Sequence, residues 1–156
     1  MSQELTLIEQ NLRSVSESSA EEIRAFISNV EDVTSKLPQI DIPLNHYFSK
    51  GTYAREIVIP KGSFIVGKIH KFENLNIISK GEVSVLSIEG LVKMKAPCTF
   101  VSSVGVKRMI FAHEETVWTT IHGTSETDLE KIESEVIASD YSEVSELPGE
   151  MQKCLG

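Results

Sequence analysis

The fold is decided by residues 56–90, which read EIVIPKGSFIVGKIHKFENLNIISKGEVSVLSIEG. Runs rich in valine, isoleucine and phenylalanine recur along this stretch, and the turn-forming sequences Pro60-Lys61-Gly62 and Ser79-Lys80-Gly81 separate them. Short β-rich runs at regular spacing, divided by such turns, are typical of a β-sandwich or barrel. We therefore expect the centre of this chain to be built from strands.

The same pattern continues to residue 121. The predicted strands are Glu56–Ile59, Phe64–Lys68, Leu75–Ser79, Val83–Ile88, Leu91–Met94, Thr99–Ser102, Val106–Ala112 and Thr116–Ile121. Eight strands suit a jelly roll. We therefore predict a mainly β chain in which residues 44–122 form a jelly-roll barrel.

Segments with apolar residues at helical spacing flank these strands. Apolar residues at spacings of three and four predict an amphipathic first helix: Leu5, Ile8, Leu12 and Val15. Ser19 and Glu22 form a capping-box signal for a second helix, which Pro38 ends. We thus expect a helical extension over residues 1–37. Its apolar stripes either pack on the barrel of the same chain or pair between copies.

The C-terminal part is shorter and more polar. Apolar residues at helical spacing after Thr127 predict a short helix over residues 125–138. Residues 139–156 are rich in serine and glutamate, and we expect an acidic tail there.

Composition limits the classes of partner. The chain has 156 residues, 40% hydrophobic and 24% charged, which fits a single globular domain. Its 15 Lys and Arg against 23 Asp and Glu give a formal charge of −8. This charge disfavours a nucleic-acid duplex or an anionic membrane as partner. A small anionic ligand in a local pocket remains compatible with it.

Cysteine content and hydropathy bear on the compartment. Cys98 and Cys154 make neither a disulfide framework nor a metal-ligand cluster, which favours a reducing compartment. The N-terminus lacks the basic start and apolar run of a signal peptide, and no stretch approaches the ~20 apolar residues of a membrane span. We expect a cytoplasmic protein.

The stretch from Gly62 to Gly81 resembles the first cupin motif, in which a glycine, two alternating histidines, a glutamate and a final glycine stand at fixed intervals. The spacing matches throughout, but Lys68 replaces the first histidine and Asn74 replaces the glutamate, so that only His70 of the metal-ligand residues is kept.

The second cupin motif is weaker, and Arg108 stands where its metal-binding histidine would lie. A guanidinium group has no lone pair for a cation. The resemblance implies a cupin-like jelly roll with Lys68, His70, Asn74 and Arg108 near one cavity. We expect no metal and no other cofactor there.

A closer resemblance covers five segments of the chain, at residues 46–56, 66–70, 76–81, 96–101 and 115–122. These segments resemble a family of small cupin-like proteins encoded by bacteriophages. The chain is similar to anti-CBASS sponges, phage inhibitors of host immunity that sequester cyclic-oligonucleotide signals. This resemblance implies a location in the host cytoplasm.

The residues themselves predict an anion-binding pocket. On a strand, Lys68, His70 and Phe72 face the same way. If the barrel closes, Arg108 joins Lys68 and His70 in a concave space with few acids, and such a space attracts phosphate. Arg108 can hold phosphate oxygens bidentately while Lys68 adds a point charge.

Polar and aromatic residues complete the predicted pocket. Asn74 or Asn76 can read the edge of a base, and Tyr53 or Trp118 can stack on it. We thus predict Lys68, His70, Asn74, Arg108, Tyr53 and Trp118 as ligand-binding residues. No catalytic residue is predicted, because no nucleophile stands beside a base in a recognisable motif.

Simpler interpretations stay open for these residues. Lys68 and Arg108 can reach solvent from an outer face, His70 can be a hydrogen-bonded core residue, and Trp118 can belong to the core or to a subunit interface.

Three classes of function therefore remain. A non-catalytic protein that sequesters a cyclic nucleotide is favoured over a structural virion or scaffold protein and over a metal-dependent cupin enzyme. We also expect a homo-oligomer, either a dimer or a tetramer, because the helices and sheet edges offer more apolar surface than one small domain covers.

Overall fold

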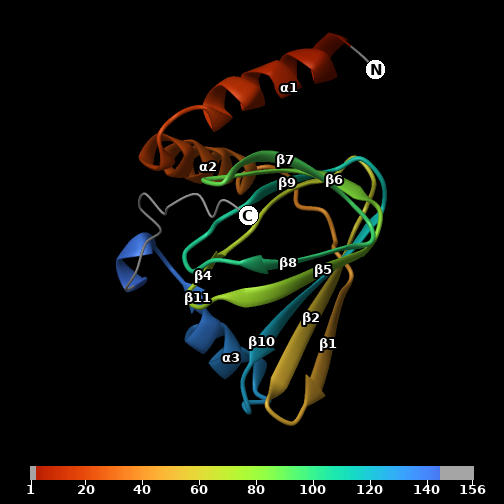
Figure 1. Cartoon of the computed structure of the whole chain (residues 1–156), viewed down its shortest axis with the longest axis vertical. Coiled ribbons are helices and arrows are strands. Elements are labelled where there is room, and N and C mark those ends of the chain that lie inside the picture. Colours follow the sequence, from red (N-terminus) through yellow and green to blue (C-terminus); the bar gives the residue numbers. More distant parts are fainter. Residues whose placement is uncertain (1–2, 145–156) are drawn as a thin grey trace, which may run out of the picture.

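The structure is a computed structural model that describes residues 3–144 (Figure 1). Its helices are α1 (Gln3–Ser16), α2 (Ala20–Thr34), α3 (Leu129–Val136) and a 3₁₀ turn, η1 (Tyr141–Glu143). The predicted capping box at the start of α2 is confirmed, since the Ser19 hydroxyl accepts a hydrogen bond from the Glu22 backbone N–H and the Glu22 carboxylate accepts one from the Ser19 backbone N–H. Helix α2 ends at Thr34, before the predicted stop at Pro38.

The strands form two main sheets and one short pair. They are β1 (Leu44–Ser49), β2 (Thr52–Ile59), β3 (Phe64–Val66), β4 (Ile69–His70), β5 (Asn74–Lys80), β6 (Glu82–Ser87), β7 (Gly90–Lys95), β8 (Cys98–Ser102), β9 (Met109–Ala112), β10 (Thr116–Gly123) and β11 (Ile137–Ala138). Sheet A has the order β1-β2-β10-β5-β8, sheet B the order β3-β9-β6-β7, and β11 pairs with β4.

The pairing of these strands is that of a jelly roll. Strand β2 pairs with β10, β3 with β9, β5 with β8 and β6 with β7, all antiparallel, so that early strands pair with late ones in nested order. Two sheets built in this way pack face to face around one core. The predicted mainly β jelly roll with helices at its N- and C-terminal sides is confirmed.

The outer face of sheet B is covered by the N-terminal helices. Ile23 and Ile27 of α2 are buried against Leu86 and Met109 of sheet B, and Leu12 of α1 packs on the same cluster. Figure 1 shows α1 and α2 lying over β6, β7 and β9. Of the two interpretations of the helical stripes, packing on the barrel of the same chain therefore holds for these residues.

One end of the sandwich interior is filled by a buried apolar cluster. Trp118 and Ile78 of sheet A are buried there against Val83, Val85 and Ile110 of sheet B. Burial of such side chains contributes roughly 1.5–3 kcal/mol each to folding. We call this part of the interior the apolar end.

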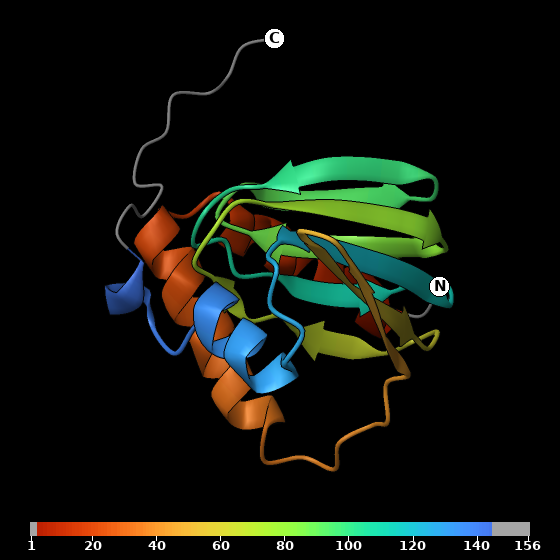
Figure 2. The ribbon, with the colours of Figure 1, turned by 90° about the horizontal axis from the view of Figure 1, so that it is seen from below.

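The other end of the strands is closed by α3 (Figure 2). Ile132 and Val136 of α3 pack on Tyr53, and the chain beyond the helix pairs through β11 with β4. Part of the predicted acidic tail belongs to this region, since Val144 is buried against Ile69 and Ala138. The rest of that tail, residues 145–156, lies outside the described residues. No helix in the described range of 3–144 has the length and apolarity that would be needed to cross a membrane.

Candidate functional site: a polar cavity at the α3 end of the barrel

The inner face of sheet A changes from apolar to polar along the strands. Strand register places side chains of the same row side by side. The row at the apolar end contains Leu44, Ile57, Trp118, Ile78 and Cys98. The next two rows are His46, Arg55, Thr120, Asn76 and Phe100, and then Phe48, Tyr53 and His122 beside the pair Asn74 and Ser102. We call the part of the interior formed by these two rows the polar end.

A cavity of about 230 Å³ opens between the sheets at this polar end. We call it the barrel cavity. Its polar lining consists of Arg55, Lys68, His70, Asn74, Asn76, Arg108 and Thr120. Val106 and Ile110 lie on its wall beside Arg108, as their shared face predicts.

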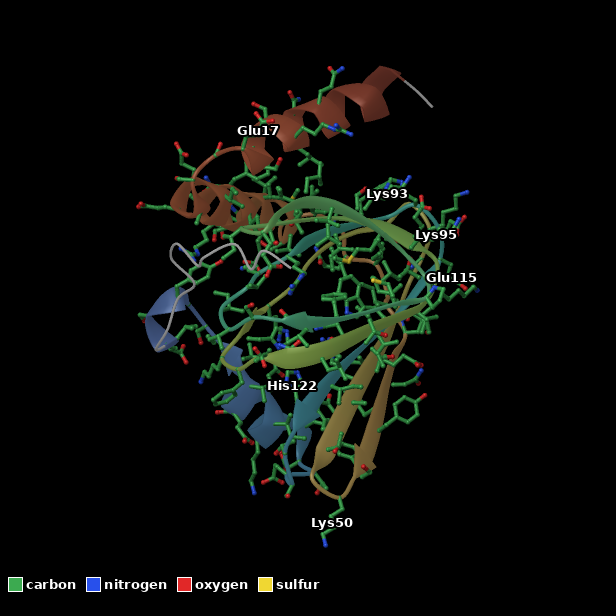
Figure 3. The ribbon with its side chains drawn as sticks, in the orientation of Figure 1. Glu17, Lys50, Lys93, Lys95, Glu115 and His122 are labelled. Atoms are coloured by element: carbon green, nitrogen blue, oxygen red, sulfur yellow. The ribbon has the colours of Figure 1, made fainter. Side chains whose placement is uncertain are left out.

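A second cavity of about 270 Å³ lies under α3, and we call it the helix cavity. It shares Leu44, Arg55, Lys68, His70 and Thr120 with the barrel cavity. Its other walls include His46, Tyr53, His122 and Glu133. Figure 3 marks His122 on the side of the molecule where α3 lies. The two cavities therefore adjoin along their shared residues.

Arg108 is the most buried cation of the barrel cavity. One guanidinium nitrogen donates to the Ser102 hydroxyl at 2.6 Å, another lies 3.4 Å from a carboxylate oxygen of Glu89, and the group stands over the Phe100 ring. Burial lowers the pKa of Arg108, and the Glu89 carboxylate acts in the opposite direction. A guanidinium group remains protonated at neutral pH in spite of such a shift, so Arg108 brings a fixed positive charge to the cavity wall.

Lys68 and Arg55 stand where the two cavities meet. Lys68 follows β3 and forms an exposed ion pair with Glu133 of α3, and this contact lowers the pKa of Glu133. Arg55 on β2 forms no ion pair with the side chains of residues 10–144, which the structure describes. Two acids approach the cations, since Glu89 pairs with Arg108 and Glu133 with Lys68. Arg55, which we did not predict from the sequence, is the one of these three cations without an acidic partner among the described side chains.

The backbone of His70 is hydrogen-bonded, but Nδ1 of its imidazole lacks a partner in the described structure. Its backbone is fixed by the pairing of β4 with β11, and its carbonyl accepts the Gly105 N–H at 2.9 Å. Its side-chain Nδ1 is buried without a partner in the described structure. Burial lowers the pKa of His70 to about 3, with further contributions from the charges of His122, Arg108 and other cations, so the ring is neutral at pH 7. Phe72, expected beside His70, is instead 54% exposed and lies outside both cavities.

The two asparagines form a fixed polar floor. Asn76 accepts hydrogen bonds from the Trp118 indole at 2.9 Å and the Thr120 hydroxyl at 3.1 Å, and it donates to the Asn74 side chain at 2.8 Å. Asn74 in turn donates to the Phe72 carbonyl. Trp118 is buried in the core with its edge against Phe100. Asn74 and Trp118 thus line the barrel cavity as its scaffold, with most of their polar groups already engaged.

A ladder of four near-parallel rings lines the helix cavity: His46, Tyr53, His122 and His70. Neighbouring ring centroids are 5.9, 6.3 and 5.2 Å apart, and the interplanar angles are 16°, 16° and 11°. The Tyr53 hydroxyl lies 2.8 Å from Nδ1 of His46. Burial raises the pKa of Tyr53 and lowers that of His122, so that both rings are uncharged at pH 7.

Five of the six predicted ligand-binding residues line the barrel cavity, and the sixth, Tyr53, lines the helix cavity together with Lys68 and His70. Sequence reasoning missed Arg55, His46 and His122. Arg55 could have been found, because it stands two residues after Tyr53 on one strand and therefore faces the same side. The position of His122 opposite Tyr53 needs the strand register, which no motif in the sequence gives.

The residues at the cupin metal positions do not fit a metal ion. Lys68 is paired with Glu133, Asn74 is bound to Asn76, and Arg108 offers only donors. His70 is the one ligand-type side chain of the four, and no cluster of three or more His, Cys, Asp or Glu side chains suited to a metal occurs in the described part of the chain. These four positions therefore suit an anion better than a cation.

Comparison with known proteins finds likeness in structure alone. No family model and no curated protein matches the sequence. A cupin superfamily protein from Desulfitobacterium hafniense is 9% identical, with a TM-score of 0.48 over 56% of this chain and 82% of the other. An RmlC-like cupin from Methanocaldococcus jannaschii is 15% identical, with a TM-score of 0.47 over 58% and 86%. An acetylacetone dioxygenase from Acinetobacter johnsonii is 18% identical, with a TM-score of 0.45 over 56% and 66%.

Proposed function

We propose that this protein binds a small anionic ligand at the polar end of its barrel and releases it unchanged. One observation carries the proposal. The cavity wall presents Arg55, Arg108 and Lys68 together, and Arg55 has no ion-pair partner in the described structure. Guanidinium groups recognise phosphate and carboxylate oxygens through paired N–H donors. A chain with a net charge of −8 thereby gathers three cations around one cavity, with Arg108 buried in its wall and Arg55 and Lys68 exposed at its edge.

The proposed ligand class is a nucleotide, with a cyclic nucleotide as the leading candidate. Each cavity alone falls below the roughly 300–1,000 Å³ of pockets for drug-sized ligands. In this proposal a phosphate occupies the barrel cavity near Arg108 and a planar base occupies the helix cavity beside the ring ladder, where stacking on aromatic faces contributes about 1–3 kcal/mol per base. Arg55, Lys68 and Thr120 line both cavities and can contact the junction of the ligand.

We propose binding without turnover because His70 lacks the surroundings of a catalytic base. Its ring has no hydrogen bond to a carboxylate or hydroxyl within the described residues, whereas a base in a catalytic triad is oriented by a third group. The resemblance to phage-encoded cupin-like proteins extends the proposal to a biological role. In that role the protein sequesters a cyclic di- or oligonucleotide signal in the host cytoplasm and so blocks antiphage immunity.

Calorimetric titration tests the proposal, with inorganic phosphate, cyclic mononucleotides and cyclic di- and trinucleotides as probes. We expect at least one cyclic nucleotide to bind, and Arg55→Ala to weaken its binding about tenfold. The matched control is Lys50→Ala, which removes the same charge from the tip of the β1–β2 hairpin (Figure 3) and leaves binding unchanged.

Chromatography of the ligand after denaturation of the complex completes the test. An intact nucleotide supports sequestration, and a linearised or hydrolysed product makes the protein an enzyme. Equal loss of affinity in the Arg55 and Lys50 variants would show that the ligand responds to overall charge and not to this site.

A further inference from the structure

The outer face of sheet A carries an apolar row that crosses all five strands. Strand register aligns Tyr47, Ala54, Ile121, Leu75 and Val101 from one edge of the sheet to the other. Tyr47 is 53% exposed, Leu75 38% and Val101 56%. Because side chains alternate between faces, these residues point away from the polar end that the same strands form.

The two sheets differ in what covers them. The outer face of sheet B is buried under α1 and α2, whereas α3 packs at the end of the barrel, on Tyr53, and no helix among residues 3–144 lies over the apolar row of sheet A. Solvent-exposed faces of antiparallel sheets are ordinarily polar. A contiguous exposed apolar row marks an interaction surface.

The low charge of this face favours a second copy of the chain as its partner. The row next to the apolar one contains Asn45, Glu56, Thr119, Ile77 and Thr99. Glu56 is its one charged residue, and its carboxylate already accepts hydrogen bonds from the Asn45 amide at 3.1 Å and the Tyr47 hydroxyl at 3.4 Å. Two chains of net charge −8 repel each other over most of their surfaces, so self-association requires a face with little charge. The apolar row lies on such a face.

The size of the face also fits a second copy. Five strands about 4.8 Å apart and up to eight residues long make a face of about 20 by 25 Å. Such a face offers about 500 Å² per copy, or about 1,000 Å² over both copies, which is near the lower limit for a specific interface. Two identical sheets can stack about 10 Å apart in a two-fold arrangement, in which the row of each copy crosses the row of the other.

We propose that the outer face of sheet A is the dimer interface of this protein, with a second copy of the chain as its occupant. The interface is independent of the proposed ligand site, since it uses the opposite face of the same strands. This interface is proposed in place of one formed by the N-terminal helices, because those helices pack on the barrel of their own chain.

Sedimentation equilibrium of the full chain tests this proposal, with the 17.3 kDa monomer mass as reference. We expect twice that mass for the unaltered protein. Val101→Glu on β8 should raise the dimer dissociation constant at least tenfold. Val92→Glu on β7 is the matched control, because it places the same charge at a 43% exposed valine on the edge strand of sheet B. We expect it to leave the mass doubled.

A second variant keeps the proposal testable if Val101→Glu fails to fold, as judged by circular dichroism. Tyr47→Ser removes an exposed ring from the opposite edge of the row and is also expected to weaken the dimer. The proposal is overturned if the unaltered chain sediments as a monomer. It is equally overturned if Val101→Glu and Tyr47→Ser remain fully dimeric, or if Val92→Glu alone dissociates the dimer.

Discussion

The same strands of sheet A build both ends of the barrel interior, yet the apolar end forms a hydrophobic core and the polar end forms the candidate binding site. At the apolar end, Trp118 and Ile78 are buried against apolar side chains of sheet B. At the polar end, Arg55 and His70 line the two cavities, and Nδ1 of His70 is buried without a hydrogen-bond partner in the described structure. The apolar end thus supplies stability to the fold. This stability allows the polar end to keep a buried polar group without a hydrogen-bond partner.

Breaking the apolar end should change the protein most. Ile78 is fully buried in this cluster, and Ile78→Ala should lower the free energy of unfolding by about 2–5 kcal/mol, because it removes buried methyl groups and leaves a void. Chemical denaturation measures this change. Ligand affinity of the folded variant should stay within twofold, and a loss as large as that of a cation variant would mean that the two ends are not separate.

The next effect comes from removing the buried charge at the polar end. Arg108→Ala should weaken nucleotide binding well over tenfold, since loss of one partner from a desolvated charged contact costs about 2–5 kcal/mol. Its Ser102 and Glu89 contacts are lost as well, so Arg108→Met, which keeps most of the volume, is the companion variant. Calorimetry on both variants gives the affinity. Unchanged affinity in both would place the ligand elsewhere.

The pH dependence of stability should reveal the neutral histidine. The folded pKa of His70 is about 3 against an ordinary value of 6.5, so between these values the unfolded chain binds a proton that the folded chain does not. Stability is therefore full above pH 6.5 and falls as the pH drops toward 3, by about 2 kcal/mol between pH 7 and pH 5. The lowered pKa of His122 acts in the same direction.

Denaturation curves of His70→Gln across this pH range provide the check. The groups that face His70 from neighbouring elements are His122, Arg55, Arg108 and Lys68, and the variant leaves them in place. Between pH 7 and pH 5 it should therefore lose most of the slope and keep the part that belongs to His122, whereas below pH 5 carboxylates with lowered pKa values, such as Glu133 and Glu143, add a slope of their own. An unchanged slope would show that His70 is not the titrating group.

The weakest effect comes from the exposed ion pair at the cavity junction. Glu133→Gln releases Lys68 from its carboxylate partner and should change the free energy of unfolding by less than about 1 kcal/mol, as exposed ion pairs contribute little. Because an acid is removed from the wall of the helix cavity, nucleotide binding should tighten about two- to fivefold. Weaker binding would indicate that Glu133 positions Lys68 for the ligand.

Much of the architecture was predictable because strand periodicity and turns are local signals. The valine-rich runs placed most strands of the two main sheets near their observed positions, and Ser19 and Glu22 marked the start of α2. The run from Val106 forms a strand only from Met109, and Val106 and Arg108 before it line the barrel cavity. The β propensity of single residues does not predict at which residue strand pairing begins.

The site was predictable only in part, because its chemistry depends on partners distant in sequence. The cationic replacements Lys68 and Arg108 were visible in the motif spacing. Their acidic partners were not, because Glu133 and Glu89 approach only when α3 and the β6–β7 turn are in place. The stacking of His122 on His70 likewise joins residues of β10 and β4, two strands of different sheets that no local sequence pattern brings together.

Binding at the polar end without turnover is tested most sharply by a nuclear magnetic resonance titration of labelled protein with the tightest-binding cyclic nucleotide. We predict that shift changes concentrate at the polar end, on Arg55, Arg108 and the His70 imidazole, while Ile78 at the apolar end and Lys50 at the hairpin tip stay unchanged. The ligand's own resonances should remain those of the intact nucleotide. Shift changes centred away from these residues, or the appearance of product resonances, would contradict this prediction.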